Sequence, residues 1–301
     1  MEEKEKCPNC NLLIDSDMDH CPYCGFDVKK YKEEQKALKE KEVIEKPAEE
    51  KSVISHKNFW NFKSVYNDVS VNLELTYFLI VFIGLDIFAV ALQSITNIIN
   101  PYFLNTVTGS AMVNFVIYFS LLSAILVLSV NNLGKLFSKF KKANTYLYGI
   151  SYGLLVILLT SLYSYIVSFL PTNVTSNVNE SSIDSIIAVF PILSIIVFGL
   201  IGPICEEFAY RLGLFSLIRR KSRLAAYIIV SLVFGLIHFD FNSVTDSSLF
   251  LNEIINLPAY ILSGLLFTYA YDKEGIETSC VAHITNNLIA IASTIFQLFL
   301  S

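Results

Sequence analysis

Charged residues are scarce in this 301-residue sequence, where they make up 16% against 53% hydrophobic residues. Average soluble domains carry about 25% charged residues, so the composition excludes an ordinary soluble protein. The shortage is uneven, because residues 1–66 hold most of the Lys and Glu while residues 76–300 are mainly apolar runs. The break near residue 70 predicts two unlike parts. The formal net charge of -5 gives no sign of nucleic-acid binding.

A cleavable signal peptide is not expected either, because the first apolar run begins at about residue 71. The first membrane helix is therefore expected to act as its own insertion signal. Most of the apolar runs reach the roughly 20 residues that a bilayer core requires. The expected fold is an all-α polytopic membrane protein with about seven transmembrane helices between residues 71 and 301. The runs fall at about 75–99, 112–130, 146–170, 183–218, 224–239, 254–271 and 279–300.

The fourth and fifth runs depart from the usual length. The fourth is too long for one span, so the part before Pro191 is expected to be interfacial or bent. The spanning helix then ends at Arg219 and carries Glu206 near its middle. The fifth run is short.

Basic residues predict the orientation of these spans. Twelve of the 22 Lys and Arg precede the first span, and all the others except Arg211 lie in alternate loops. This alternation follows the positive-inside rule for a multi-pass plasma-membrane protein with a cytosolic N-terminus and an extracytoplasmic C-terminus. The basic loop residues are Lys135, Lys139, Lys141, Lys142, Arg219, Arg220, Lys221, Arg223 and Lys273.

Four cysteines near the N-terminus form two C-x2-C turns, in the segments CPNC and CPYCG. Two such turns complete a tetrahedral four-sulfur site, which predicts a structural zinc-ribbon module over residues 1–28. So short a segment cannot bury enough apolar surface to fold alone, so the metal would supply the folding energy. A cytosolic N-terminus argues against the rival reading of two disulfides. The expected zinc ligands are Cys7, Cys10, Cys21 and Cys24.

Residues 29–70 form the expected connection between the module and the membrane. The segment 29–58 is rich in Lys and Glu, has few apolar residues and is interrupted by Pro47, which is typical of a solvated linker. Aromatic residues from Phe59 to Tyr66 alternate with Lys and suit an approach to the bilayer interface.

Ionisable side chains at membrane depth are costly and mark functional sites by default. Glu206 and Glu207 are adjacent, and neighbouring residues on a helix point about 100° apart, so the two carboxylates diverge. Glu207 and Arg211 have the i,i+4 spacing and order that favour an ion pair. This pairing leaves Glu206 free for chemistry.

Two further patterns lie on later helices. Phe234 precedes His238 by four residues, so its ring can pack beside the imidazole, and His283 and Asn287 share a helix face. At 1.5 Å per residue, Glu206 and His238 lie roughly 20 Å and His283 roughly 15 Å from a basic loop. The three patterns are therefore expected to converge within the bilayer.

The ordered motifs EExxxR, FxxxH and HxxxN on successive membrane helices resemble the CAAX protease and bacteriocin-processing (CPBP or ABI) family. That family includes the type II CAAX prenyl endopeptidases. The resemblance covers about residues 145–300 and leaves the zinc module and linker outside. Each motif alone is weak, but both histidines of the membrane region fall in the trio. The resemblance implies an intramembrane endopeptidase.

The family also implies roles for individual residues. Glu206 and His238 would activate a water molecule, while His283 and Asn287 would stabilise the oxyanion. A metal-dependent version, with Glu206 and both histidines as ligands, is chemically reasonable although no HExxH motif is present. The residues alone allow both versions. The supporting residues are Glu207, Arg211 and Phe234.

Other functions fit the same residues. They could form a polar network that only holds the helices together, as in a non-catalytic membrane scaffold or regulator, or in a bacteriocin self-immunity protein on the same fold. A proton-coupled transporter is a further alternative, but the paired broken helices in two repeats that it would carry are missing from the sequence.

The substrate is not encoded in any motif. The Phe, Ile and Tyr-rich, Lys-bearing composition is typical of a low-GC bacterium, where prenylated CAAX proteins are not expected. A peptide, a bacteriocin precursor or a membrane-protein segment is the favoured substrate. The expected partners are this substrate, the lipid bilayer and a cytosolic partner for the zinc ribbon, with no nucleic acid.

Overall fold

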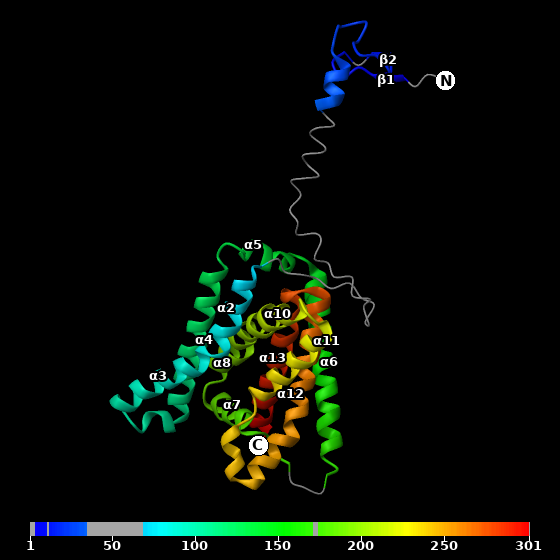
Figure 1. Ribbon diagram of the computed structural model, residues 1–301. Helices are drawn as coiled ribbons and strands as arrows, with labels where there is room; N and C mark the ends of the chain where they lie inside the picture. Colours follow the sequence, from blue (N-terminus) through cyan, green and yellow to red (C-terminus); the bar gives the residue numbers. More distant parts are fainter. Residues whose placement is uncertain (1–3, 11, 35–68, 171–173, 301) are drawn as a thin grey trace. The chain divides into compact units, whose positions relative to one another are not determined.

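The computed structural model describes residues 4–10, 12–34, 69–170 and 174–300. The chain divides into two compact units, Met1–Asn61 and Phe62–Ser301 (Figure 1). Residues 28–34 are helical. Most of the predicted linker over residues 29–70 lies outside the described residues, so its structure stays a prediction.

The N-terminal unit is built around its cysteines. Strand β1 (Lys4–Lys6) pairs antiparallel with β2 (Leu13–Asp15), and Glu5 lies opposite Ile14. Over residues 4–10 and 12–34, the buried interior consists of Cys7, Ile14, Cys21 and Val28. Two aliphatic side chains and two thiols bury too little apolar surface for an independent fold, so the cysteine chemistry must contribute.

The second unit is helical, and it confirms the expected all-α polytopic membrane fold (Figure 1). Helix α11 (Arg223–Leu236) is apolar but has 14 residues, and it corresponds to the predicted short fifth span. The seven expected spans therefore appear as six long helices and one short one. Within the described residues, six helices are long and apolar enough to cross a membrane: Val71–Ile99, Val107–Ser129, Ala143–Val167, Pro191–Arg219, Ser247–Glu274 and Ile276–Leu300.

The first long helix is interrupted at Ile83, which separates α2 (Val71–Phe82) from α3 (Gly84–Ile99). The short helix η2 (Phe103–Asn105) then leads into α4 (Val107–Ser129). In Figure 1, α3 and the start of α4 project from the bundle. The side chain of Thr106 caps α4 by accepting a hydrogen bond from Gly109 N.

The predicted break before Pro191 is present. Helix α7 (Val178–Val189) ends at Phe190, and the next helix starts at Pro191, where the missing N–H costs no helical bond. In the helix that follows, 56% of an apolar 18-residue stretch is buried, against 11–33% in the other long helices. This helix is therefore the central helix of the bundle. Its parts are α8 (Pro191–Ser194), η4 (Ile195–Ile201), α9 (Gly202–Glu206), η5 (Glu207–Phe215) and α10 (Ser216–Arg219).

Glycine brings two helices of the bundle close together. Helix α6 (Ala143–Val167) packs on α13 (Ile276–Leu300). A Cβ atom on Gly149 would lie 2.5 Å from the Val281 side chain, and one on Gly153 would lie 2.6 Å from Ala282 O. Small residues at such a crossing let the backbones approach, as in membrane helix pairs generally.

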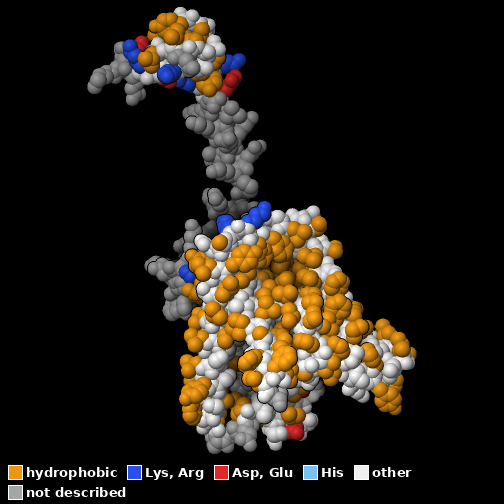
Figure 2. Space-filling model, turned by 180° about the vertical axis from the view of Figure 1, so that it is seen from behind, with side chains coloured by type: hydrophobic (Ala, Val, Ile, Leu, Met, Phe, Trp, Pro, Cys, Tyr) orange, Lys and Arg blue, Asp and Glu red, His pale blue; other side chains and the backbone are white. Residues whose placement is uncertain are grey.

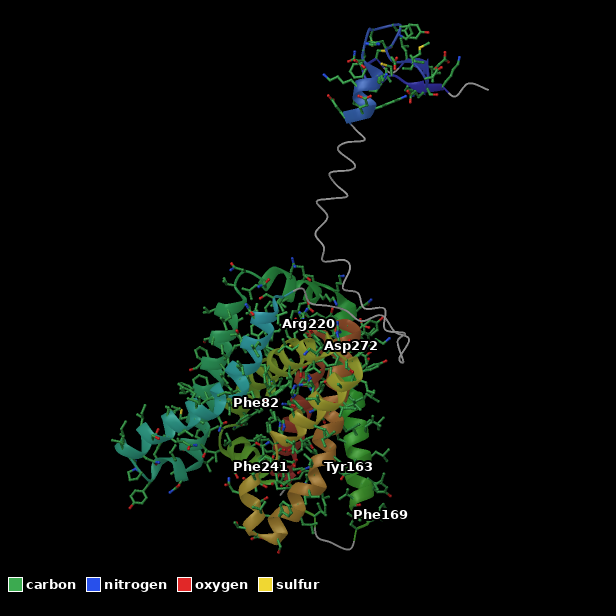
Figure 3. All side chains as sticks on the ribbon, in the orientation of Figure 1. Phe82, Tyr163, Phe169, Arg220, Phe241 and Asp272 are labelled. Carbon is green, nitrogen blue, oxygen red and sulfur yellow. The ribbon has the colours of Figure 1, made fainter. Side chains whose placement is uncertain are left out.

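Basic side chains gather at one end of the helical unit, beyond a flank covered by apolar side chains (Figure 2). Asp272, at the end of α12 (Ser247–Glu274), pairs with Arg219 and Arg223, and Glu74 accepts two hydrogen bonds from Arg220 (Figure 3). The loop that contains α5 (Leu133–Leu136) and η3 (Ser138–Lys141) joins the same end, since Lys139 N donates to Glu277 at 2.9 Å. The three basic loops therefore meet, as the charge pattern predicted.

Candidate active site

The central helix places both glutamates at a change of helix type. Glu206 ends α9, and Glu207 begins η5, which is π-helical like η4 before it. The π-helix is rare in proteins, and its occurrences are frequently found at functional sites. The Glu207 side chain is fully buried, whereas 14% of the Glu206 side chain remains exposed.

The predicted ion pair is present. Arg211 Nη1 lies 3.1 Å from Glu207 Oε1, and both side chains are 0% exposed. The guanidinium carbon lies 4.3 Å from the centre of the Phe234 ring, which is within range of a cation–π interaction. Arg211 Nη2 also donates to Gly264 O at 3.2 Å. The buried charge of Arg211 is thus compensated on several sides, as a charge in an apolar interior requires.

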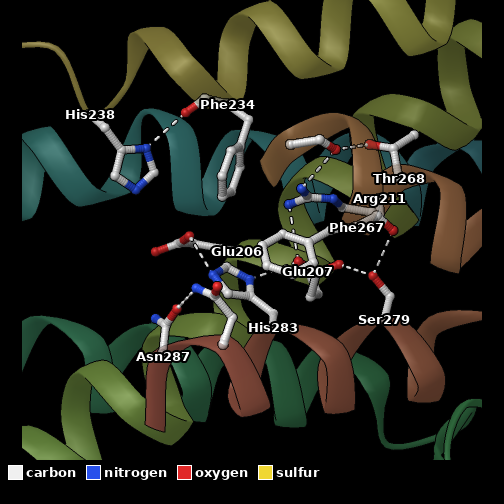
Figure 4. Close-up of polar contacts among 12 residues, drawn as sticks. Glu206, Glu207, Arg211, Phe234, His238, Phe267, Thr268, Ser279, His283 and Asn287 are labelled. Atoms are coloured by element: carbon white, nitrogen blue, oxygen red, sulfur yellow. Dashed lines mark hydrogen bonds and ion pairs between the residues drawn. The ribbon is translucent and has the colours of Figure 1, made fainter. Parts of the chain in front are cut away.

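Glu207 has a second partner that the sequence did not reveal. His283 Nδ1 lies 2.8 Å from Glu207 Oε1, and the Ser279 hydroxyl donates to Glu207 Oε2 (Figure 4). On the other side of the same ring, His283 Nε2 lies 3.8 Å from Glu206 Oε2. The two adjacent carboxylates therefore face opposite nitrogens of one imidazole, so Glu207 orients His283 as well as neutralising Arg211.

His238 follows the end of α11, with its ring turned back on its own helix. Its Nδ1 lies 2.8 Å from Phe234 O (Figure 4). The Phe234 ring packs between the two histidines, with its centre 5.0 Å from the His238 ring and 5.7 Å from the His283 ring. The predicted packing of Phe234 beside His238 is therefore present. The His238 ring lies in the same cluster as Glu206 and His283 (Figure 4).

Asn287 lies one helical turn after His283 on α13, as predicted. Its Nδ2 donates to Phe198 O at 2.9 Å, and its Oδ1 accepts a hydrogen bond from Asn286 at 3.0 Å. An amide nitrogen carries two N–H donors, so one remains for a ligand. The Phe198 carbonyl thereby fixes the orientation of the Asn287 amide.

The structure brings the three sequence motifs into one cluster and adds residues that no motif contained. Ser279 binds Glu207, and the Phe267 ring stacks on His283 with 4.3 Å between centres and 21° between planes. The spacing Ser279, His283, Asn287 repeats every four residues, and this signal could have identified Ser279. Phe267 has no such signal, because it comes from α12.

The four N-terminal cysteines form a second candidate site. The Sγ atoms of Cys7 and Cys24 are 3.8 Å apart, and those of Cys10 and Cys21 are 3.7 Å apart. Four sulfurs bound tetrahedrally at about 2.3 Å would be about 3.8 Å apart, so the donor set fits one zinc ion. A hydrogen bond from the Asn9 side chain, with another from the Phe26 backbone, lowers the pKa of the Cys24 thiol to about 6.

The four cysteines lie close enough together to bind one metal ion. Their four ligand atoms all lie within 4.8 Å of one another. Within the described ranges, Glu206, His238 and His283 do not form such a group of three. The structure therefore gathers donors for a metal at the cysteine site.

The fold and the buried polar cluster define an α-helical multi-pass membrane protein with an internal site. Residues 188–289 match the family model described as Rce1-like, type II CAAX prenyl endopeptidase Rce1-like. The match confirms the resemblance drawn from the motifs. The matched segment contains all the residues of the three motifs, from Glu206 to Asn287. It is narrower than the expected core of about residues 145–300, and it supports CAAX-type intramembrane protease activity in general.

A relative from Mycoplasma capricolum subsp. capricolum, named an uncharacterized protein, is 26% identical over 149 residues. The aligned part covers 46% of this chain and 41% of the relative. No solved structure matches the chain.

Proposed function

We propose that the helical unit is an intramembrane endopeptidase that hydrolyses a peptide bond in a membrane-associated or lipidated protein or peptide. The observation that carries this proposal is a buried carboxylate oxygen of Glu206 that accepts no hydrogen bond from the described residues. This oxygen is Oε2. A buried carboxylate oxygen without a partner is costly, and a bound water would supply the missing hydrogen bond.

In the proposed reaction, Glu206 with His238 removes a proton from this water, and the water oxygen attacks the carbonyl carbon of the scissile bond. The carbonyl oxygen becomes an oxyanion, which accepts hydrogen bonds from His283 and Asn287. The C–N bond then breaks, and Glu206 returns the proton to the departing amine nitrogen. The water supplies the OH of the new carboxyl group, so the step is balanced.

Glu207 and Arg211 support this reaction by fixing His283. Because His283 Nδ1 is committed to Glu207 Oε1 at 2.8 Å, its Nε2 can donate to an oxyanion only when the ring carries both protons. The Phe267 ring stacked on the imidazole holds its plane. The proposed role of the Glu207 carboxylate, next to the catalytic Glu206, is therefore to orient the His283 ring.

The proposed arrangement in the cell follows from the loop charges. The N-terminus lies in the cytosol of a bacterium, where the four thiols stay reduced and hold a structural zinc ion, and the C-terminus lies outside. A reporter fused at Ser301 is expected to read as extracytoplasmic and one inserted at Lys139 as cytosolic. The opposite result at either position would reverse this topology.

Substrate trapping tests the proposed activity. The Glu206→Gln chain keeps the shape of the site but lacks the base, so it should retain uncleaved substrate when purified from cells, while the wild type should not. The recovered proteins can be presented to the wild type in vesicles, next to quenched fluorescent peptides with and without a C-terminal farnesyl group. Absence of cleavage of every recovered protein and peptide would leave the scaffold function in place of the peptidase.

A further inference from the structure

Helix α11 ends just before His238, and its last carbonyls lack helical partners. His238 N bonds to Gly235 O at 3.1 Å instead of Phe234 O. The ring of His238 takes up the Phe234 carbonyl through Nδ1. The carbonyl of His238 itself then needs a donor from another element, as do the backbone groups of the turn that follows.

Asn177 supplies that donor. Its Nδ2 donates to His238 O at 3.1 Å, and the residue is 2% exposed. Asn177 is also the N-cap of α7, where its Oδ1 accepts from Glu180 N at 2.8 Å. The start of α7 is therefore attached to the backbone of His238.

Tyr260 of α12 holds the ring of His238. The two rings are stacked with 4.5 Å between centres and 16° between planes. The Tyr260 hydroxyl donates to Asn177 Oδ1 at 3.3 Å. One face of the imidazole is thus covered by a side chain that is itself tied to Asn177.

Glu253, also on α12, holds the next turn of the chain. Its Oε2 accepts from Asp240 N at 3.0 Å, and its Oε1 accepts from Val178 N at 2.8 Å. Glu253 is 1% exposed, so these bonds form away from water, where they matter most. The carboxylate links the turn after His238 to the start of α7.

We propose that Asn177, Glu253 and Tyr260, here named the His238 clamp, are positioning residues that set the place and ring orientation of His238 in the reaction. With Nδ1 bound to Phe234 O, the clamp presents Nε2 for proton transfer. This inference rests on the proposed function for its effect on cleavage. Asn177 lies outside the matched segment 188–289, and no clamp residue belongs to the three motifs.

Three variants separate the clamp from general packing. Tyr260→Phe keeps the stacked ring and should leave kcat within about threefold, whereas Tyr260→Leu removes it and should lower kcat about 10–100-fold at unchanged KM. Asn177→Ser keeps the N-cap but is too short to reach His238 O, so it should lower kcat in the same direction. The assay uses the full chain in vesicles and the fastest-cleaved peptide of the panel above.

Tyr163→Phe is the matched control. Tyr163 on α6 also donates from its phenol to α12, to Ile255 O at 2.6 Å (Figure 3), and this variant should leave kcat unchanged. A readout independent of cleavage is available, because the chain has four histidines. In 15N-histidine spectra, His238 should carry its proton on Nδ1 in the wild type and populate both tautomers in Tyr260→Leu.

The outcomes decide between the two proposals. If the wild type cleaves nothing but Tyr260→Leu changes the His238 tautomer, the proposed function fails, and the clamp stands as the set of residues that orients the His238 ring. The clamp is refuted if Tyr260→Leu and Asn177→Ser keep both kcat and the wild-type tautomer, or if Tyr163→Phe lowers kcat equally. Should Tyr260→Leu fail to fold, Asn177→Ser decides by the same two measurements.

Discussion

Among the described residues of the N-terminal unit, cysteines occupy the interior and leave only Ile14 and Val28 as buried aliphatic side chains. In the helical unit, by contrast, a large apolar interior surrounds a polar cluster in which Glu207 and Arg211 are fully buried. The first unit is therefore expected to depend on its cysteine ligands for folding, while the second folds by packing and must compensate the polar groups that it holds. This difference predicts that removing a metal ligand unfolds the first unit, whereas in the helical unit the effect of removing a polar group depends on which buried charge that group compensates.

The largest effect is expected from removing the zinc ion proposed for the N-terminal unit. Structural zinc contributes about 10–16 kcal/mol of apparent binding free energy in small modules, so chelation should unfold this unit completely. A peptide of residues 1–28 should lose its circular dichroism signal with chelator and bind one zinc ion per chain. Equal spectra with and without chelator would contradict the prediction.

The matched variant Cys7→Ser tests the independence of the two units. It should abolish the zinc content of the full chain and leave membrane insertion and thermal unfolding of the helical unit unchanged. A lower unfolding temperature of the helical unit in Cys7→Ser would show that the comparison between the units is wrong.

The next largest effect concerns Glu206, which is polar but not needed for packing. Glu206→Gln should lower kcat about 10²–10⁴-fold, because general-base catalysis commonly contributes that factor. Its unfolding temperature in detergent should equal that of the wild type. A destabilised Glu206→Gln variant, or one that cleaves normally, would remove Glu206 from the role of base.

The neighbouring Glu207→Gln should fail in a different way. It leaves Arg211 buried without its counter-charge, which typically costs about 3–5 kcal/mol, so the unfolding temperature should fall sharply. Adding Arg211→Met removes the uncompensated charge and should restore most of the stability.

The double variant Glu207→Gln with Arg211→Met also tests the second role of Glu207. Its cleavage should stay low even though it folds, because the carboxylate that binds His283 Nδ1 is gone. Restored stability with wild-type cleavage would show that Glu207 serves the ion pair alone.

The smallest of these effects concerns packing without charge. Gly153→Ala places a Cβ 2.6 Å from Ala282 O, so α13 must shift next to His283. Such overpacking typically costs about 1–3 kcal/mol, which a thermal unfolding curve would detect. Gly134→Ala is the control, because nothing lies within 4 Å of its added Cβ. Equal unfolding temperatures for both variants would contradict the prediction.

Features that depend on neighbours in the chain could be predicted from the sequence. The apolar runs predicted the membrane helices, and Pro191 predicted the break before the central helix. The two C-x2-C turns predicted four clustered thiols, and the i,i+4 spacing predicted the contact between Glu207 and Arg211. Spacing along a helix fixes which side chains share a face, so these predictions needed no tertiary information.

Contacts between helices could not be predicted in the same way. The expectation that Glu207 pairs with Arg211 and leaves Glu206 free did not include His283, although both carboxylates face its ring from α13. Likewise, no spacing connects Asn177 or Tyr260 with His238, which lies on a third element. The sequence by itself therefore determined the membrane helices, the thiol ligands and the local pair. Only the tertiary structure decided which nitrogen each carboxylate faces and what holds His238, because these depend on how distant helices rotate and cross when they pack.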